Sequence, residues 1–190
     1  SNYHYPKPKV RNAKLSFAPG GVGPASGIGC IRSGHFPPGV QGRFLSNQLS
    51  GVRATHWFDL KENGNGYKAI RVRPDLLSST DPYHRPVAMT FGPDGALYIA
   101  DFYSPVIENT SYPKRHPGRD HLRGRIWRIT AKGRPLLKQP KIEGEPVVKL
   151  LELLKSTQPP TRHFARRELQ EKAAAAVPPD LKKWLKKNKF

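Results

Sequence analysis

The pattern that most constrains the fold of this chain is a β-hairpin followed by a long polar loop and a further strand. Two runs of β-type residues, 87–91 and 96–102, meet at a Gly-Pro-Asp-Gly sequence in which Asp94 is suited to capping the turn. A third β-type run occupies 125–130. The pattern predicts an antiparallel sheet, and the near-continuous apolar content of 96–102 predicts a strand buried on both faces.

The same strand-and-turn pattern occurs upstream, in β-type runs at 42–47, 52–60 and 67–73. Two Asn-Gly pairs within 62–66 favour a hairpin, and Lys68, Arg71 and Arg73 are expected on the solvent side of the last strand. Meanders that repeat in this way are typical of β-propeller blades. A six-bladed ring needs about 250 to 300 residues. We therefore expect residues 41–132 to form a mainly β fold, a partial propeller of two to three antiparallel blades.

The segments on either side differ in composition. Residues 1–40 are rich in glycine and proline and are expected to be irregular, and 133–145 is expected to be a linker. Residues 146–190 predict a small α-helical segment: one helix ending before Pro159, a second from Arg162 to about Ala175 capped by Thr161, and a third from Pro178. A single pair of this kind does not bury its apolar face without neighbours, which predicts that it packs against a partner or against the propeller fragment; a docking role is the hypothesis.

The charge of the chain indicates an anionic partner. Thirty-three Lys and Arg residues face 14 Asp and Glu, for a net charge of +19. Acidic protein surfaces, nucleic acids and lipid headgroups are the usual partners of such chains. The sequence has no recognition motif for nucleic acid, so nucleic acid is not the preferred partner. It has no apolar run long enough to span a membrane. Cys30 is the single cysteine, so the chain has neither an internal disulfide nor a haem-attachment motif.

The polar loop before residue 125 is the candidate for chemistry. Its weak catalytic candidates are His121, Asp120 and His116, and its candidates for binding an anion or anionic cofactor are Arg115, Arg119, Arg123 and Arg125. In one interpretation Asp120 orients His121 as a base. In the preferred one, Asp120 pairs with a neighbouring arginine and pins the loop against the sheet.

Other candidates are weaker. Asp94 or Asp101 could join His116, Asp120 and His121 around a divalent ion, but the preferred interpretation has no metal. Four histidines are assigned no role beyond packing or surface: His35, His56, His84 and His163. The C-terminal candidates for binding an acidic partner are Lys182, Lys183, Trp184, Lys186 and Lys187; a solvated helix end is the alternative.

Four stretches carry a resemblance to a known family: FGPDGALYIADFY at 91–103, SGHFPPGVQGRF at 33–44, and the longer runs at 63–89 and 116–130. They resemble the propeller and HEAT-repeat region of planctomycete and verrucomicrobial proteins called membrane-bound dehydrogenases, and more widely soluble glucose dehydrogenases and NHL propellers. The resemblance implies an exported, periplasmic propeller that passes electrons to a c-type cytochrome. It also implies pyrroloquinoline quinone and calcium as cofactors, if the chain is catalytic.

The chain departs from that family where a histidine is expected. It has Ile107-Glu108-Asn109 in place of Ile-Gly-His, and no haem motif. The preferred hypothesis is therefore a non-catalytic accessory or structural module of a larger, redox-active, exported assembly, which contacts acidic protein subunits and a cytochrome c. The alternatives are a fragment of a quinone-dependent sugar or alcohol dehydrogenase and, second, a basic nucleic-acid-binding module.

Overall fold

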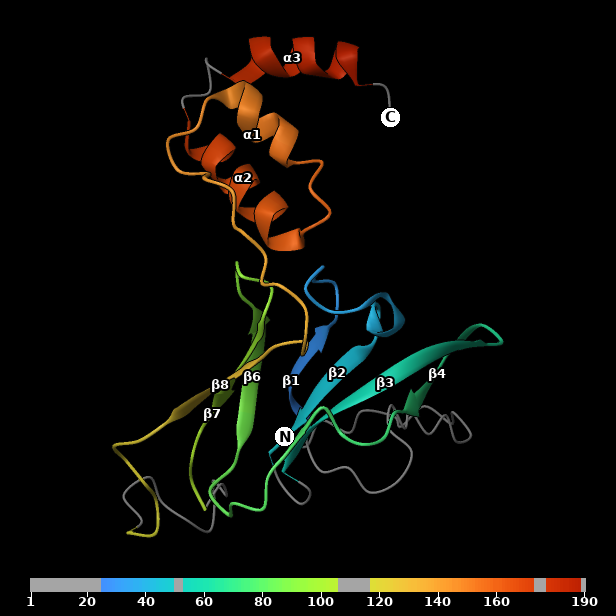
Figure 1. Cartoon of the computed structure of the whole chain (residues 1–190), viewed down its shortest axis with the longest axis vertical. Coiled ribbons are helices and arrows are strands. Elements are labelled where there is room, and N and C mark those ends of the chain that lie inside the picture. Colours follow the sequence, from blue (N-terminus) through green and yellow to red (C-terminus); the bar gives the residue numbers. More distant parts are fainter. Residues whose placement is uncertain (1–24, 50–52, 106–116, 173–176, 189–190) are drawn as a thin grey trace, which may run out of the picture.

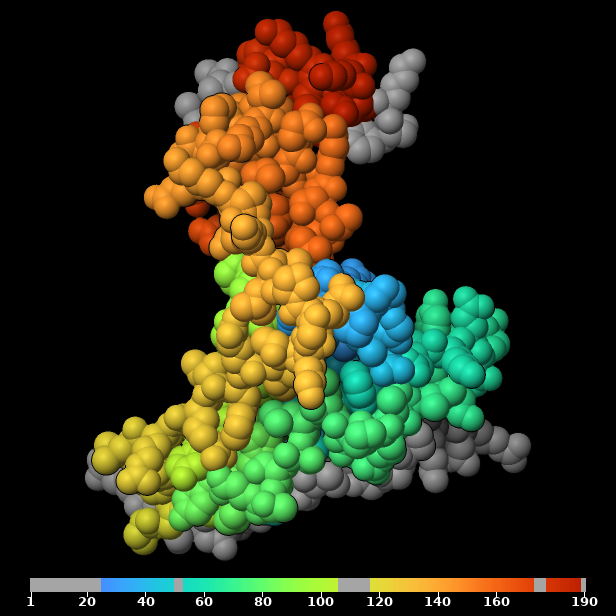
Figure 2. Space-filling model, viewed as in Figure 1, coloured from blue at the N-terminus to red at the C-terminus, as the bar shows by residue number. Residues whose placement is uncertain are grey.

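The computed structural model describes residues 25–49, 53–105, 117–172 and 177–188. Two antiparallel sheets are followed by three helices, and the helices lie beyond one end of the strands (Figure 1). In Figure 2 a narrow neck joins the helical part to the wider strand part. No helix in the described ranges is long and apolar enough to cross a membrane.

The first sheet has the order β1-β2-β3-β4, with β5 pairing to β3; its strands are β1 (Ala25–Cys30), β2 (Phe44–Gln48), β3 (Ala54–Asn63), β4 (Gly66–Arg71) and β5 (Leu77–Ser78). A 3-10 turn, Pro38–Val40, lies between β1 and β2. The second sheet has the order β6-β7-β8, with β6 (Pro86–Phe91), β7 (Leu97–Asp101) and β8 (Arg125–Ile129). The predicted antiparallel strands are therefore present, and the two sheets do not close into a ring within the described ranges.

Strand β1 corrects the expectation that residues 1–40 are irregular. Its small residues have little intrinsic β preference, so its pairing with β2 and its position beside β6 determine the strand. A Cβ atom at Gly27 would lie 2.8 Å from the Asn47 amide nitrogen and 2.9 Å from the Val87 carbonyl oxygen. Glycine is thus the residue that lets the two sheets approach here.

The core lies between the facing sides of the two sheets. Leu45 of the first sheet and Leu97 and Ile99 of the second are fully buried, and half-buried Trp57 and Trp127 pack around them. Strand β7 alternates buried and half-buried residues. The prediction that it is buried on both faces was wrong, because only one of its faces meets the other sheet.

The helices are α1 (Val147–Leu153), α2 (Pro159–Glu171) and α3 (Val177–Lys187). Helix α2 begins three residues earlier than predicted, and Thr161 lies within its first turn rather than capping it. The reason is that proline is favoured at the start of a helix. Its φ is fixed near the helical value, and the N–H that it lacks would have no partner in the first turn. Residues 133–145 contain turns but no helix or strand. The end of the predicted second helix, 173–175, lies outside the described ranges.

Candidate functional site

Buried polar side chains gather at one end of the two sheets, where β6 and β8 begin and β7 ends. In Figure 1 this end lies opposite the helices. The buried members are Asn47, Gln48, Thr55, His56, His84, Arg85 and Asp101. Because buried polar groups are costly unless they are paired, such a concentration marks this end as the candidate functional site.

Asp101, at the end of β7, is the centre of this network. Its Oδ1 accepts from the backbone N–H groups of Arg85 (2.7 Å) and Tyr103 (3.0 Å), and its Oδ2 from His84 Nδ1 (2.9 Å), Arg125 Nε (3.0 Å) and Trp127 Nε1 (2.9 Å). Burial alone raises the pKa of this carboxyl, but these hydrogen bonds lower it to about 2. Asp101 is therefore ionised and its oxygens are fully engaged.

Arg125 holds the polar loop to the strands. Besides Asp101, it contacts Asp81 at 2.6 Å, and its guanidinium lies 4.2 Å from the ring centroid of Tyr103. Burial lowers the pKa of Arg125, but the bonds to Asp81 and Asp101 outweigh burial and raise it. This arginine, predicted as an anion ligand, is thus neutralised by carboxylates of its own chain.

Asp120 shapes its own loop. Its Oδ1 accepts from the backbone N–H groups of Leu122 (3.0 Å) and Arg123 (3.1 Å), and its Oδ2 lies 3.7 Å from the Arg123 guanidinium. The expected pairing of Asp120 with a neighbouring arginine is therefore present. The pinning of the loop to the sheet, however, comes from Arg125 and Asp101.

The loop lines a hollow of about 930 Å³ next to Asp101. Four predicted residues are brought together there: Arg119, Asp120, His121 and Arg123. The other predicted loop residues, Arg115 and His116, lie outside the described ranges, as does Asn109. Val87, Phe102 and Leu122 supply apolar surface in the same hollow, so it offers both cationic and apolar contacts.

His56, assigned no role from the sequence, belongs to a second buried polar group. Its Nδ1 lies 3.0 Å from Asp75 Oδ1 and 2.8 Å from the Arg71 guanidinium, which also binds Asp75. Burial lowers the pKa of His56, against the opposing effect of Asp75. Arg71, expected on the solvent side, is largely buried because it bridges these groups, whereas Arg73 is 65% exposed.

His84 and His35 were also missed. His84 is fully buried against Asp101, with its ring edge-on to Trp127. His35 binds across the chain: its Nδ1 lies 2.9 Å from the Pro135 carbonyl oxygen, and its Nε2 accepts from the Ala131 N–H. Nothing near these histidines in the sequence marks them, because their partners lie 17 to 100 residues away.

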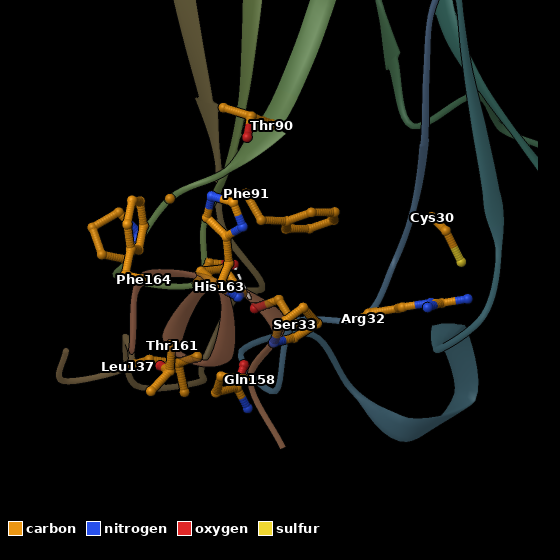
Figure 3. A pocket seen from close by; sticks show the side chains of 15 residues that line it. Cys30, Arg32, Ser33, Thr90, Phe91, Leu137, Gln158, Thr161, His163 and Phe164 are labelled. Atoms are coloured by element: carbon orange, nitrogen blue, oxygen red, sulfur yellow. Dashed lines mark hydrogen bonds between the residues drawn. The ribbon is translucent and has the colours of Figure 1, made fainter. Parts of the chain in front are cut away.

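A second cavity, of about 480 Å³, lies at the other end of the sheets, between the strand loops and α2. Figure 3 shows His163 with the aromatic rings of Phe91 and Phe164 around it. The Gly34 N–H donates to Gln158 Oε1 at 3.1 Å at its margin. The cavity lies where the strand part and the helical part meet. No feature of the sequence predicted it.

The C-terminal candidates divide into two groups. Lys182, Lys183, Lys186 and Lys187 are exposed on α3. Trp184 is 9% exposed, and its indole N–H donates to Glu152 of α1 at 2.7 Å. The prediction that Trp184 faces a partner is corrected, because its side chain packs against α1 of the same chain.

The carboxylates considered for a metal are engaged by protein donors. Asp94 accepts from the Ala96 N–H and the Tyr98 hydroxyl and pairs with Arg128, which confirms its turn-capping role. Asp101 is similarly saturated. Among the residues that the structure describes, no group of three or more His, Cys, Asp or Glu side chains is arranged to hold a metal ion.

Comparison with known proteins gives a family but no relative of known activity. A family model described as "Domain of unknown function (DUF7133)" matches residues 4–133. No curated protein and no solved structure matches the chain. The matched range covers both sheets and the polar network around Asp101. Because the match spans more than half of the chain, this protein belongs to the DUF7133 family.

Proposed function

We propose that this chain is a non-catalytic structural module of a larger, exported, redox-active assembly, in which its two sheets serve as blades of an incomplete propeller and its helices as a HEAT-like extension. Acidic subunits are the partners that its positive charge fits, and a cytochrome c is the partner that the family resemblance implies. One observation carries the proposal: apolar side chains are exposed on the outward face of the second sheet, near the start of β8, and just beyond its strands.

That face is opposite to the core. On β8 Ile126 is 74% exposed, in register with Ala100 of β7, while Phe102 just beyond β7 is 48% exposed and Leu122 just before β8 is 95% exposed. Strand β8 is also an edge, pairing with β7 alone within the described ranges. An apolar sheet face beside an open edge is the kind of surface that another sheet covers in a layered β fold.

Engagement of the carboxylates supports a structural rather than catalytic role. Asp101, Asp94 and Asp75 are each bound by arginine or histidine of the same chain. A general base needs a free acceptor within reach of substrate. These carboxylates hold loops and strands together instead.

The native complex tests the proposal. We expect the wild-type chain, expressed in its source cells, to purify in a complex well above its own 21.3 kDa, and Ile126→Glu to be recovered as the free chain. Tyr67→Glu is the matched control, since Tyr67 is 71% exposed on β4, away from this face. A wild-type chain that is monomeric, or an Ile126→Glu variant that assembles normally, would overturn the proposal.

The helices allow a second, separate test of the proposal. We expect deletion of residues 146–190 to weaken incorporation into the assembly, because a single helical repeat of this kind needs neighbours to cover its apolar surface. Val148, 55% exposed, and Leu185, 48% exposed, remain open to a neighbour. Unchanged assembly after the deletion would remove the helices from the docking surface.

A fragment of a quinone-dependent sugar or alcohol dehydrogenase is the second candidate, and the hollow beside Asp101 favours it. Arg119 and Arg123 there suit the carboxylates of pyrroloquinoline quinone, which would supply the electron acceptor. Calcium does not fit, because the Asp101 oxygens are already engaged by five donors. Reduction of an electron-accepting dye after adding quinone and a sugar or alcohol would support this candidate. Binding of the quinone without dye reduction would favour the structural role instead.

A further inference from the structure

We propose that Arg53 and Arg85, at the polar end of the two sheets, form a binding site for one oxyanion group, a phosphate or a carboxylate. Arg53 directly precedes β3, and Arg85 directly precedes β6. The inference is independent of the proposed docking face, because it concerns two arginines at the polar end of the sheets, one buried and one half-buried.

The guanidinium of Arg85 is buried without a carboxylate partner. The residue is 7% exposed, its two terminal nitrogens donate to the carbonyl oxygens of His84 (2.8 Å) and Pro105 (3.0 Å), and its buried Nε has no acceptor. Carbonyl oxygens fix the group in place but carry no negative charge. The nearby Asp101 and Asp81 raise the pKa of Arg85, but burial and Arg53 outweigh them and lower it. The arginine is therefore held ready for an anion.

Arg53 brings a second cation to the same place. Its Nε is likewise buried without an acceptor, and its charge is close enough to lower the pKa of Arg85, second only to burial. Its backbone has φ of 49°, in the left-handed region that a long side chain rarely occupies. Local strain and like-charge repulsion both oppose this arrangement in the free protein.

The carboxylates nearest to the pair are already in use. Asp101 accepts five hydrogen bonds, including one from the Arg85 backbone but none from its guanidinium, and Asp81 binds Arg125 and the Tyr83 N–H. No ion pair joins Arg53 or Arg85 to any carboxylate in the part of the chain that the structure describes. An external anion would supply the missing acceptors and cancel the repulsion.

The chemistry of the donors limits the class of ligand. Two planar donor groups at the ends of neighbouring sheets match the several acceptor oxygens of a phosphate or carboxylate. Halides offer no separated acceptor oxygens. The oxyanion arrives either as a free phosphate or as an acidic side chain, and these share the same chemistry.

The test is a thermal-shift titration of the full 190-residue chain with inorganic phosphate and, separately, acetate, against sodium chloride at equal ionic strength. We expect phosphate or acetate to stabilise the wild-type chain more than chloride does. In Arg53→Met we expect that difference to disappear, with the anion's dissociation constant raised by about tenfold or more. A stronger response to phosphate assigns a phosphate ligand, and a stronger response to acetate assigns a carboxylate.

A control and a second readout separate this site from general charge effects. Arg166→Met removes the same charge from the exposed surface of α2 and is expected to respond to the anions like wild type. Without oxyanions, we expect Arg53→Met to melt higher than wild type, because the repulsion is gone. The proposal is overturned if chloride matches the oxyanions, or if Arg53→Met retains the wild-type response. Arg53→Met is chosen because Arg85→Met also loses two carbonyl bonds and is more prone to misfold.

Discussion

The Nε2 atom of His35 accepts a hydrogen bond of 2.8 Å from the backbone N–H of Ala131, 96 residues further along the chain. Since Nε2 is the acceptor, the ring proton is on Nδ1, which faces the carbonyl oxygen of Pro135 at 2.9 Å. Arg134 adds a bond of 2.7 Å to the His35 carbonyl oxygen. The segment after β8 is thus fastened to the loop after β1, and this fastening positions the start of the linker to the helices.

Replacing His35 with alanine should loosen that fastening. The half-buried Ala131 N–H and the exposed Pro135 carbonyl lose their partner, and a typical hydrogen bond contributes about 0.5–1.5 kcal/mol to stability. Hydrogen exchange of the Ala131 amide should accelerate markedly. His163→Ala, which removes an exposed histidine, should leave that amide unchanged; equal protection of Ala131 in His35→Ala would contradict the assigned role.

Asp101→Asn should be the most damaging single change at the polar end. It removes the buried carboxylate of the Arg125 pair and leaves Arg125 with Asp81 alone, and breaking a buried ion pair costs about 3–5 kcal/mol. Urea unfolding of the two proteins measures the difference. The control is Asp59→Asn, since Asp59 is 47% exposed and its pair with Arg43 should contribute at most about 1 kcal/mol. Similar losses of unfolding free energy in both variants would argue against Asp101 as the centre of the polar network.

Acid should weaken the fold through the same carboxyl. The pKa of Asp101 is about 2 in the folded chain, below its ordinary value of 3.8, so its stabilisation is present above pH 3.8 and is lost as the pH falls toward 2. The shift corresponds to about 2 kcal/mol. The stability difference between wild type and Asp101→Asn, measured by urea unfolding, should shrink by that amount across this interval. A difference independent of pH would refute this account.

Gly27→Ala should destabilise the junction of the two sheets. The added methyl would meet the Asn47 amide at 2.8 Å and the Val87 carbonyl at 2.9 Å, and overpacking of this kind costs about 1–3 kcal/mol. Gly39→Ala is the matched control, because nothing lies within 4 Å of the corresponding position. Thermal unfolding of both variants measures the difference in stability. Equal unfolding midpoints would mean that the strands move apart to accommodate the methyl group without a loss of stability.

Trp184→Ala should release α3 from α1. The variant loses a side chain that is 9% exposed together with its bond to Glu152, and truncation of a buried tryptophan costs about 3–5 kcal/mol. Limited proteolysis should then cut near α3 before the sheets are attacked. Leu185→Ala, at a residue 48% exposed, should change stability by no more than about 0.5 kcal/mol and leave the digestion pattern intact.

Short-range patterns predicted the elements well. The Gly-Pro-Asp-Gly turn is present, with Asp94 binding the Ala96 N–H at 3.0 Å, and strands follow the β-type runs on either side. The start of α1 directly after Pro146 was also predicted. These features depend on backbone preferences and contacts within a few residues, and the sequence displays such contacts directly.

Long-range contacts explain the corrections. Strand β1 was missed because its small residues matter only beside β6, and Trp184 was assigned to a partner because its contact with Glu152 lies 32 residues away. At the candidate site the loop residues were predicted, but the buried histidines were not. His56 and His84 acquire their roles from Asp75 and Asp101, which the fold brings to them.

The sequence by itself determined the antiparallel strands, their turns, the change to helices after the linker and the strong positive charge, because local preferences and composition suffice for each. Only the tertiary structure decided what the charged residues do. Arg125 lies between Asp81 and Asp101. Arg85 is buried and Arg53 half-buried, and no carboxylate in the described ranges pairs with either guanidinium. The physical reason is that the energy of a buried charge depends on which groups surround it, and those groups come from distant parts of the chain.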